Sequence, residues 1–130
     1  MKLTLRGVPP PKKNSRRIFR VGQKVVNIPS LRYSKWHDMA WCDMPKHIEK
    51  AEEPCSVRIE YWMPDRRRRD LSNITESIMD FLVDQGVLSD DNCSVVIWLA
   101  MRNMGRDKEN PRTEIEICPS LFKLENWHTD

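Results

Sequence analysis

Regular alternation of apolar and polar residues predicts three strands along this chain of 130 residues. Residues 2–7 (KLTLRG), 55–63 (CSVRIEYWM) and 113–118 (TEIEIC) each place apolar side chains at every second position. This pattern is typical of a strand that covers a core with one face only. We expect residues 2–7 to form an exposed edge strand of the sheet. Pro64 should end the strand over residues 55–63.

A fourth strand and a hairpin follow from less regular patterns. Residues 94–101 (SVVIWLAM) are almost continuously apolar and rich in β-branched side chains. Such a run predicts a strand buried on both faces, with Trp98 in the core. Residues 17–21 and 24–28 flank a Gly-Gln dipeptide, and glycine at the first position of a two-residue loop is typical of a β-hairpin.

Two helices are predicted by apolar residues at helical spacing. Ser30 is a suitable N-terminal cap for the first helix, whose apolar positions extend as far as Ile48. Pro45 would kink or end that helix. The second helix spans residues 71–85 and is followed by Gly86, a typical C-terminal cap. Its apolar stripe is the most regular in the chain: Leu71, Ile74, Ile78, Phe81 and Leu82.

The predicted element order is β-β-β-α-β-α-β-β, a mixed β-sheet with about two main helices. This order places the chain in the α/β (α+β) class. Its length agrees with a single domain, which we assign to residues 1–130, with a C-terminal tail at 119–130 that the pattern does not explain. The strand-helix-strand unit from Cys55 to Met101 is a candidate parallel crossover.

Composition favours a cytoplasmic protein without a membrane partner. No apolar run approaches the ~18 residues of a transmembrane helix, and the N-terminus reaches charge and proline too soon for a signal peptide. The four cysteines, at positions 42, 55, 93 and 118, form no CxxC pair, which excludes a zinc knuckle and a thioredoxin-like motif. We expect reduced thiols in the core.

Charge is distributed unevenly along the chain. Residues 1–35 contain ten basic residues and no acidic one, whereas the remainder contains twelve basic and nineteen acidic residues. The basic part includes a proline-rich loop over residues 8–15 that carries Lys12 and Lys13 and that excludes helix or central strand. This distribution indicates a polyanionic partner, with nucleic acid as the first candidate. Charge alone leaves a solvated basic face equally open.

Two polar segments flank the second helix and are candidates for chemistry. Residues 65–73 (DRRRRDLSN) precede it, and Asp90-Asp91-Asn92 follow it. A helix of about 15 residues is ~22 Å long, so the segments meet only if the next strand runs back beside the first, or if residues near position 70 curl over the sheet. The sequence leaves this open. Asp70 is also a suitable helix cap, and the second segment a suitable turn.

These segments resemble the RusA family of Holliday junction resolvases, which are endonucleases of bacteria and their phages. The resemblance rests on residues 63–73 (MPDRRRRDLSN), on Asp84-Gln85-Gly86, on Leu88-Ser89-Asp90-Asp91 and on Gly7-Val8-Pro9-Pro10 with Asn14. It extends over residues 5–118 at the level of element order. The arginine run ended by Asp70, with Asp90-Asp91 twenty residues later, forms a specific pair of motifs.

The resemblance implies a homodimer that nicks two opposed strands of a four-way DNA junction in recombination and repair. It implies Mg²⁺ as cofactor, with Mn²⁺ as an alternative. Asp70 and Asp91 match the family's essential carboxylates, catalytic and metal-binding, and Asp90 matches an acidic neighbour at the metal. The expected DNA-binding residues are Lys12, Lys13, Asn14, Arg16, Arg17, Arg66, Arg67, Arg68, Arg69 and Asn73.

Two positions depart from the better-known branch of that family. Ser72 stands where that branch has a further essential Asp, and Glu76 where it has a functional Lys. Residues 72 and 76 share one helix face, so Glu76 can return the missing carboxylate as a third catalytic and metal-binding group. Hard oxygen ligands of this kind suit Mg²⁺. Arg69, Lys12 or Lys13 are candidates to replace the lost Lys charge.

Two alternatives belong to other function classes. The changes at residues 72 and 76 are compatible with a DNA-junction binding module that has lost catalysis. An acidic metal-binding or interaction domain without nucleic acid is disfavoured by the basic first quarter. A homodimer also suits the geometry, because a globule with a radius of gyration of about 14 Å reaches one scissile phosphate, whereas a two-fold junction needs two symmetric nicks.

Overall fold

A computed structural model describes residues 1–12 and 16–120 and confirms the predicted element order. The predicted C-terminal tail beyond residue 120 lies outside the described residues. The elements are β1 (Lys2–Arg6), β2 (Arg16–Val21), β3 (Lys24–Pro29), α1 (Leu31–Asp43), β4 (Cys55–Met63), α2 (Leu71–Asp84), β5 (Val96–Arg106) and β6 (Arg112–Pro119).

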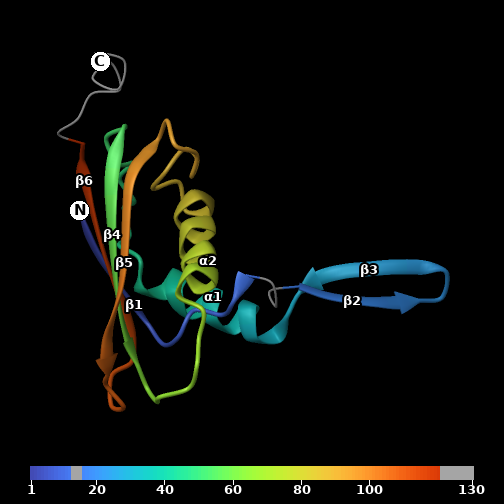
Figure 1. The fold of residues 1–130 in the computed structure, drawn as a ribbon. Helices are drawn as coiled ribbons and strands as arrows, with labels where there is room; N and C mark the ends of the chain where they lie inside the picture. Colours follow the sequence, from blue (N-terminus) through green and yellow to red (C-terminus); the bar gives the residue numbers. More distant parts are fainter. Residues whose placement is uncertain (13–15, 121–130) are drawn as a thin grey trace.

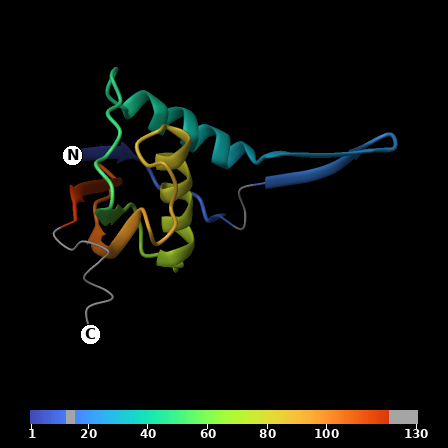
Figure 2. The same ribbon diagram turned by 90° about the horizontal axis from the view of Figure 1, so that it is seen from above.

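The main sheet has four strands in the order β1-β6-β4-β5. Strands β4 and β5 pair in parallel, and the other two pairs are antiparallel. The predicted crossover and the edge position of β1 are therefore both confirmed. Helices α1 and α2 lie on one face of this sheet (Figures 1 and 2). The fold is a mixed α+β domain with one sheet layer and one helix layer.

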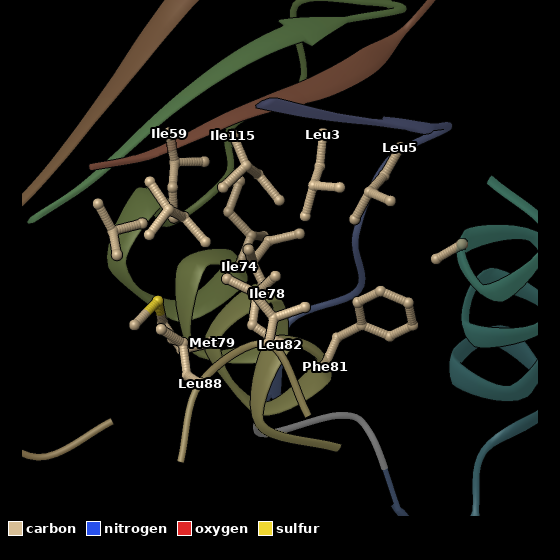
Figure 3. Packing of buried hydrophobic residues seen from close by; sticks show 14 of the residues in the cluster. Leu3, Leu5, Ile59, Ile74, Ile78, Met79, Phe81, Leu82, Leu88 and Ile115 are labelled. Carbon is tan, nitrogen blue, oxygen red and sulfur yellow. The ribbon is translucent and has the colours of Figure 1, made fainter. Parts of the chain in front are cut away.

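The core lies between the covered sheet face and α2 (Figure 3). Every second residue of β4 is buried, and Val57, Ile59 and Tyr61 have no exposed surface. From the helix, Ile78 and Leu82 are equally buried. Truncating such a side chain to Ala typically costs about 2–5 kcal/mol of stability, so this core fixes the position of α2 on the sheet.

The helix ends agree with the predicted capping residues. The Ser30 hydroxyl accepts a hydrogen bond from the backbone N–H of Tyr33 at 3.1 Å, and Gly86 adopts the left-handed φ of 77° after α2. Helix α1 ends at Asp43, before Pro45. Ile48 therefore lies outside the helix, contrary to its spacing, because proline removes the backbone N–H needed to continue it.

The prediction that the fourth strand is buried on both faces is wrong. Strand β5 is an edge strand, and Trp98 is 53% exposed while Leu99 is 39% exposed. The helix layer covers only one face of the sheet, and among residues 1–12 and 16–120 no strand pairs with the outer edge of β5. The strand also runs on to Arg106, five residues beyond its predicted end at Met101. An apolar run alone does not reveal how much of a strand its neighbours cover.

The cysteine prediction is confirmed in part. All four are free thiols, but only Cys55 is buried, whereas Cys42, Cys93 and Cys118 are exposed. In the described residues, no helix is both long enough and apolar enough to cross a bilayer.

The predicted hairpin is confirmed as a separate two-stranded sheet formed by β2 and β3. Its two-residue loop begins at Gly22, which has a φ of 63°, a conformation that glycine adopts without strain. The hairpin projects away from the rest of the molecule (Figures 1 and 2). We call residues 16–29 the arm.

Candidate active site

Asp70 is held at the N-terminal end of α2, where the backbone selects a capping residue. Its Oδ1 accepts hydrogen bonds from the backbone N–H groups of Ser72 (3.2 Å) and Asn73 (3.4 Å) and from the Ser72 hydroxyl (2.8 Å). The capping role is therefore real. An ionised carboxylate has about four lone-pair positions, and the side chain remains exposed, so capping does not exclude a second role.

Arginines surround this carboxylate in a groove of about 260 Å³. Arg32 lines this groove from α1, whereas the other three arginines come from the loop between β4 and α2. A groove that combines several guanidinium groups with a helix N-terminus favours phosphate. We call it the arginine groove; its lining residues are Pro9, Pro11, Arg32, Arg67, Arg68, Arg69, Asp70, Asn73 and Ile74.

Arg69 is the tightly bound member of the arginine run, whereas the other three are exposed and only Arg67 among them adds a longer ion pair to Asp65, at 3.8 Å. Arg69 donates to both carboxylate oxygens of Asp65, at 2.7 and 3.3 Å. This contact is the main reason that the pKa of Asp65 falls to about 2, aided by the backbone N–H of Arg67. Arg66, Arg67 and Arg68 keep exposed side chains. The loop therefore holds its shape through Arg69 and presents the other guanidinium groups to solvent.

Ser72 and Glu76 lie on one exposed face of α2, as their spacing predicts. Glu76 is six residues beyond Asp70, which corresponds to ~9 Å along the helix axis. Lys12 lies on the same side, because its ammonium group pairs with Asp80, one turn beyond Glu76. That hydrogen bond is the main cause of the raised pKa of Lys12, and the charge of Glu76 contributes in the same direction.

The proline-rich loop is placed against α2 by a buried contact. The hydroxyl of Ser77 donates to the carbonyl oxygen of Pro10 at 2.6 Å, and both residues are buried. This contact brings Lys12, two residues further along, within reach of the helix. Lys13 and Asn14, two predicted DNA-binding residues, lie outside the described residues.

Asp90 and Asp91 lie beyond the C-terminal end of α2, in a second groove of about 580 Å³. Asp90 accepts hydrogen bonds from the backbone N–H of Asp91 (2.7 Å) and from the side chain of Asn92 (2.9 Å), and the first of these is the main cause of its lowered pKa. The predicted turn is thus present. We call this the acidic groove; its lining residues are Lys12, Arg16, Pro29, Tyr33, Ser34, His37, Asp38, Asp80, Val83, Asp84, Asp90 and Asp91.

Sequence reasoning missed three carboxylates of the acidic groove: Asp38, Asp80 and Asp84. A signal for two of them was present, because Glu76, Asp80 and Asp84 follow one another at four-residue spacing and so share a helix face. Asp38 comes from α1, and nothing in its sequence surroundings indicates that α1 would lie beside this end of α2.

The structure does not bring Asp70 and Asp91 together within one chain. Because β4 and β5 are parallel, α2 must run the length of the sheet between them, and its 14 residues span ~21 Å. The loop before α2 lies at its lower end in Figure 1, and the loop after it at its upper end. Within residues 1–12 and 16–120, no three His, Cys, Asp or Glu side chains form a group suited to a metal ion.

The remaining predicted DNA-binding residues fall into two places. Asn73 lies in the arginine groove. Arg16 lines the acidic groove and bonds to Asn27 at the base of the arm. Arg17 lies further along the arm, with its guanidinium carbon 5.6 Å from the centre of the Phe19 ring.

Comparison with known proteins identifies a family. The family model described as Endodeoxyribonuclease RusA matches residues 7–118. The crossover junction endodeoxyribonuclease RusA of Aquifex aeolicus (strain VF5) is 32% identical over 94 residues, 71% of this chain and 72% of that protein. The proteins of that name in Escherichia coli (strain K12) and in Enterobacteria phage 82 are each 50% identical over 38 residues, 29% of this chain. That alignment spans about a third of the length of those two relatives, 32%. On the match over residues 7–118, the chain belongs to the RusA endodeoxyribonuclease family.

Proposed function

We propose that this protein is an Mg²⁺-dependent, structure-selective endodeoxyribonuclease of bacterial or phage origin. It would resolve four-way DNA junctions in recombination and repair by paired symmetric nicks, as a homodimer. The observation that carries this proposal is the carboxylate of Asp70, fixed at a helix N-terminus in a groove with four arginines. The guanidinium groups would bind the phosphates on either side of the bond to be cut, beside a carboxylate able to hold a metal ion.

The carboxylates suit Mg²⁺ in kind but are divided between two grooves. Asp70, Glu76, Asp90 and Asp91 all supply the hard oxygen atoms that this ion prefers, yet Asp70 and Asp91 lie beyond opposite ends of α2, which is ~21 Å long. A second copy of the chain, related by a two-fold axis across α2, would set the arginine groove of one protomer beside the acidic groove of the other. We therefore propose that each active site is shared between two protomers.

Each groove would contribute a different part of the chemistry. The arginine groove neutralises phosphate charge and orients the strand, with Arg67 and Arg68 as its exposed cations. The acidic groove adds Asp91 and Asp90, and Glu76 projects between the two from the exposed face of α2. When bound, Mg²⁺ would supply an activated water molecule and withdraw charge from the phosphate oxygens.

A cleavage assay tests this proposal. Purified protein is incubated with a synthetic four-way junction or with a linear duplex of the same sequence, in Mg²⁺ or in EDTA. We expect paired nicks in the junction with Mg²⁺ only, and no cutting of the duplex. Cleavage in EDTA would contradict the requirement for a metal ion, and equal cutting of both substrates would contradict selectivity for junctions.

A junction-binding module without catalysis is the second candidate, and Ser72 and Glu76 are the observations that favour it. In the structure, Ser72 donates its hydroxyl proton to Asp70 and so adds no negative charge there. Under this alternative, the protein binds the junction tightly and nicks it under no Mg²⁺ or Mn²⁺ condition.

A further inference from the structure

The arm is a two-stranded sheet that no other element of the described chain covers. All six residues of β2 are exposed, among them Ile18 at 67%, Phe19 at 40% and Val21 at 59%, and Val25 of β3 is 65% exposed. An isolated two-stranded hairpin is marginally stable in water at best. Apolar side chains on such an arm indicate a contact that forms with another molecule.

The register of the arm defines a face on which an aromatic ring and cations alternate. Cross-strand partners share a face, and the pairs Arg17 with Ile28, Phe19 with Val26, and Val21 with Lys24 therefore lie on one side. We call this the Phe19 face. The guanidinium group of Arg17 lies over the Phe19 ring at 5.6 Å, which leaves the ring between a cation and the loop at the tip.

The base of the arm is fixed to the body of the protein. Strand β3 ends at Pro29, and Ser30 immediately caps α1. Across the base, the Arg16 guanidinium donates to the side-chain oxygen of Asn27 at 3.0 Å and to its carbonyl oxygen at 2.8 Å. The direction of the arm is thus tied to α1, which also supplies Arg32 to the arginine groove.

Charge indicates what the arm contacts. Residues 16–29 contain four basic side chains and no acidic one. Two arms of this charge repel each other, whereas the phosphates of a nucleic acid attract them. Apolar side chains next to these cations suit the bases better than the charged backbone.

We propose that the Phe19 face enters the centre of branched DNA and stacks on bases at the exchange point, and that Phe19 thereby selects junctions over linear duplex. This inference rests on the proposed function. Insertion into a linear duplex must first separate two stacked base pairs, at a cost of several kcal/mol. Base pairs at the exchange point of an open junction, the form present without divalent metal ions, lack a stacking neighbour on one side, so the same ring stacks there at lower cost. Phe19 is on this view a specificity-determining residue that takes no part in hydrolysis.

The test compares three variants by equilibrium binding to a four-way junction and to a linear duplex of the same sequence, in EDTA so that no cutting occurs. Phe19→Leu keeps an apolar partner for Val26 but removes the ring, and Phe19→Trp keeps a ring. Ile18→Ala, on the opposite face, is the matched control. A 2-aminopurine base at the exchange point reports stacking directly.

We expect Phe19→Leu to weaken junction binding roughly tenfold, in line with the loss of one base-aromatic stack, and to leave duplex binding unchanged. The 2-aminopurine signal should change on binding of wild type and Phe19→Trp but not of Phe19→Leu. The Ile18→Ala variant should keep the wild-type preference for the junction, because Ile18 lies on the opposite face of the arm.

Three outcomes would contradict either the proposed function or the proposed role of the arm. A wild-type protein without preference for the junction contradicts the proposed function itself. A wild-type preference that Phe19→Leu retains contradicts only the role of the arm. Phe19→Leu could instead lower the molecular mass of the free protein in light scattering and weaken binding to both the junction and the duplex. The arm would then contact a second copy of the chain, and the inference would be wrong.

Discussion

The two ends of α2 carry opposite kinds of groove. At the N-terminal end, Asp70 lies among Arg32, Arg67, Arg68 and Arg69. At the C-terminal end, Asp90 and Asp91 lie with Asp38, Asp80 and Asp84, against the cations Lys12 and Arg16. The first groove is rich in cations with one carboxylate, and the second is rich in carboxylates.

The helix itself reinforces this difference. Its N-terminus carries partial positive charge and its C-terminus partial negative charge, so the arginine groove favours an anion and the acidic groove a cation. Phosphodiester hydrolysis with a metal ion needs both kinds of environment at one phosphate. In the proposed dimer, the arginine groove of one protomer would meet the acidic groove of the other.

Removing either carboxylate should have the largest effect. We expect Asp70→Asn and Asp91→Asn to reduce junction cleavage by more than the ~10–100-fold that is typical when a group merely supporting a metal ligand is lost. Junction binding in EDTA should stay unchanged or increase, because each change removes negative charge near phosphate. A folded variant that still cuts normally would remove that residue from the metal site.

The change Glu76→Gln separates an active site of unusual composition from an inactive one. If Glu76 supplies the third carboxylate, its loss should cost activity on the scale of Asp70→Asn, as measured by the rate of junction nicking. Glu49→Gln is the control: it is the same substitution at an exposed residue that lines neither groove, and it should leave the nicking rate unchanged.

A double change sharpens the same question. Ser72→Asp with Glu76→Lys moves the negative charge back by one helical turn, and we expect it to keep or recover cleavage. If wild type nicks no junction in Mg²⁺ or Mn²⁺ and the double change creates nicking, Glu76 binds no metal ion and the binding-module alternative holds.

Arginine substitutions should have a smaller effect that is not specific to junctions. Replacing Arg67 and Arg68 with Ala should weaken binding to every DNA form and reduce the salt dependence by about one unit of slope per lost phosphate contact. A salt titration of wild type and variant on the same duplex measures this. Equal slopes would mean that these side chains are only solvated.

The smallest expected effect concerns the shape of the arginine loop. Arg69→Ala should raise the pKa of Asp65 from about 2 towards the ordinary value near 3.9, as followed by NMR titration of that carboxyl group. The sign follows from the depressed pKa: in wild type the ion pair stabilises the fold above pH ~4, and this contribution is lost as pH falls towards 2. An unchanged pKa in the variant would show that other groups hold this loop.

Most of the fold could be predicted because its signals are local. Asp70, Gly86 and the apolar stripe of α2 specify that helix within one segment of the chain, and the alternation in β4 specifies its covered face. The environment of β5 could not be predicted, because Trp98 shares with its partner Ser56 the sheet face that the helices leave open. Which face of a strand the helices cover depends on the arrangement of the whole domain and cannot be predicted from the sequence of the strand alone.

The candidate site, like the fold, could be predicted from the sequence only in part. Asp70, the arginine run and Asp90-Asp91 could be selected from residue type and spacing. Their separation depends on whether β5 runs parallel to β4, a choice that the sequence leaves open and that the structure settles as parallel. Arg32 lines the arginine groove and Asp38 lines the acidic groove only because α1 packs along α2, where the rings of Trp36 and Phe81 are 5.5 Å apart.

Mixing two inactive variants tests the shared site most directly. Asp70→Asn and Asp91→Asn proteins are unfolded together and refolded as a mixture, and junction nicking is compared with each variant refolded alone. In a mixed dimer, one site then carries both changes and the other carries neither. If each site is shared between two protomers, the mixture regains nicking of one junction strand, while neither variant alone cuts. A mixture that forms mixed dimers but stays as inactive as its components would contradict a site built from two protomers.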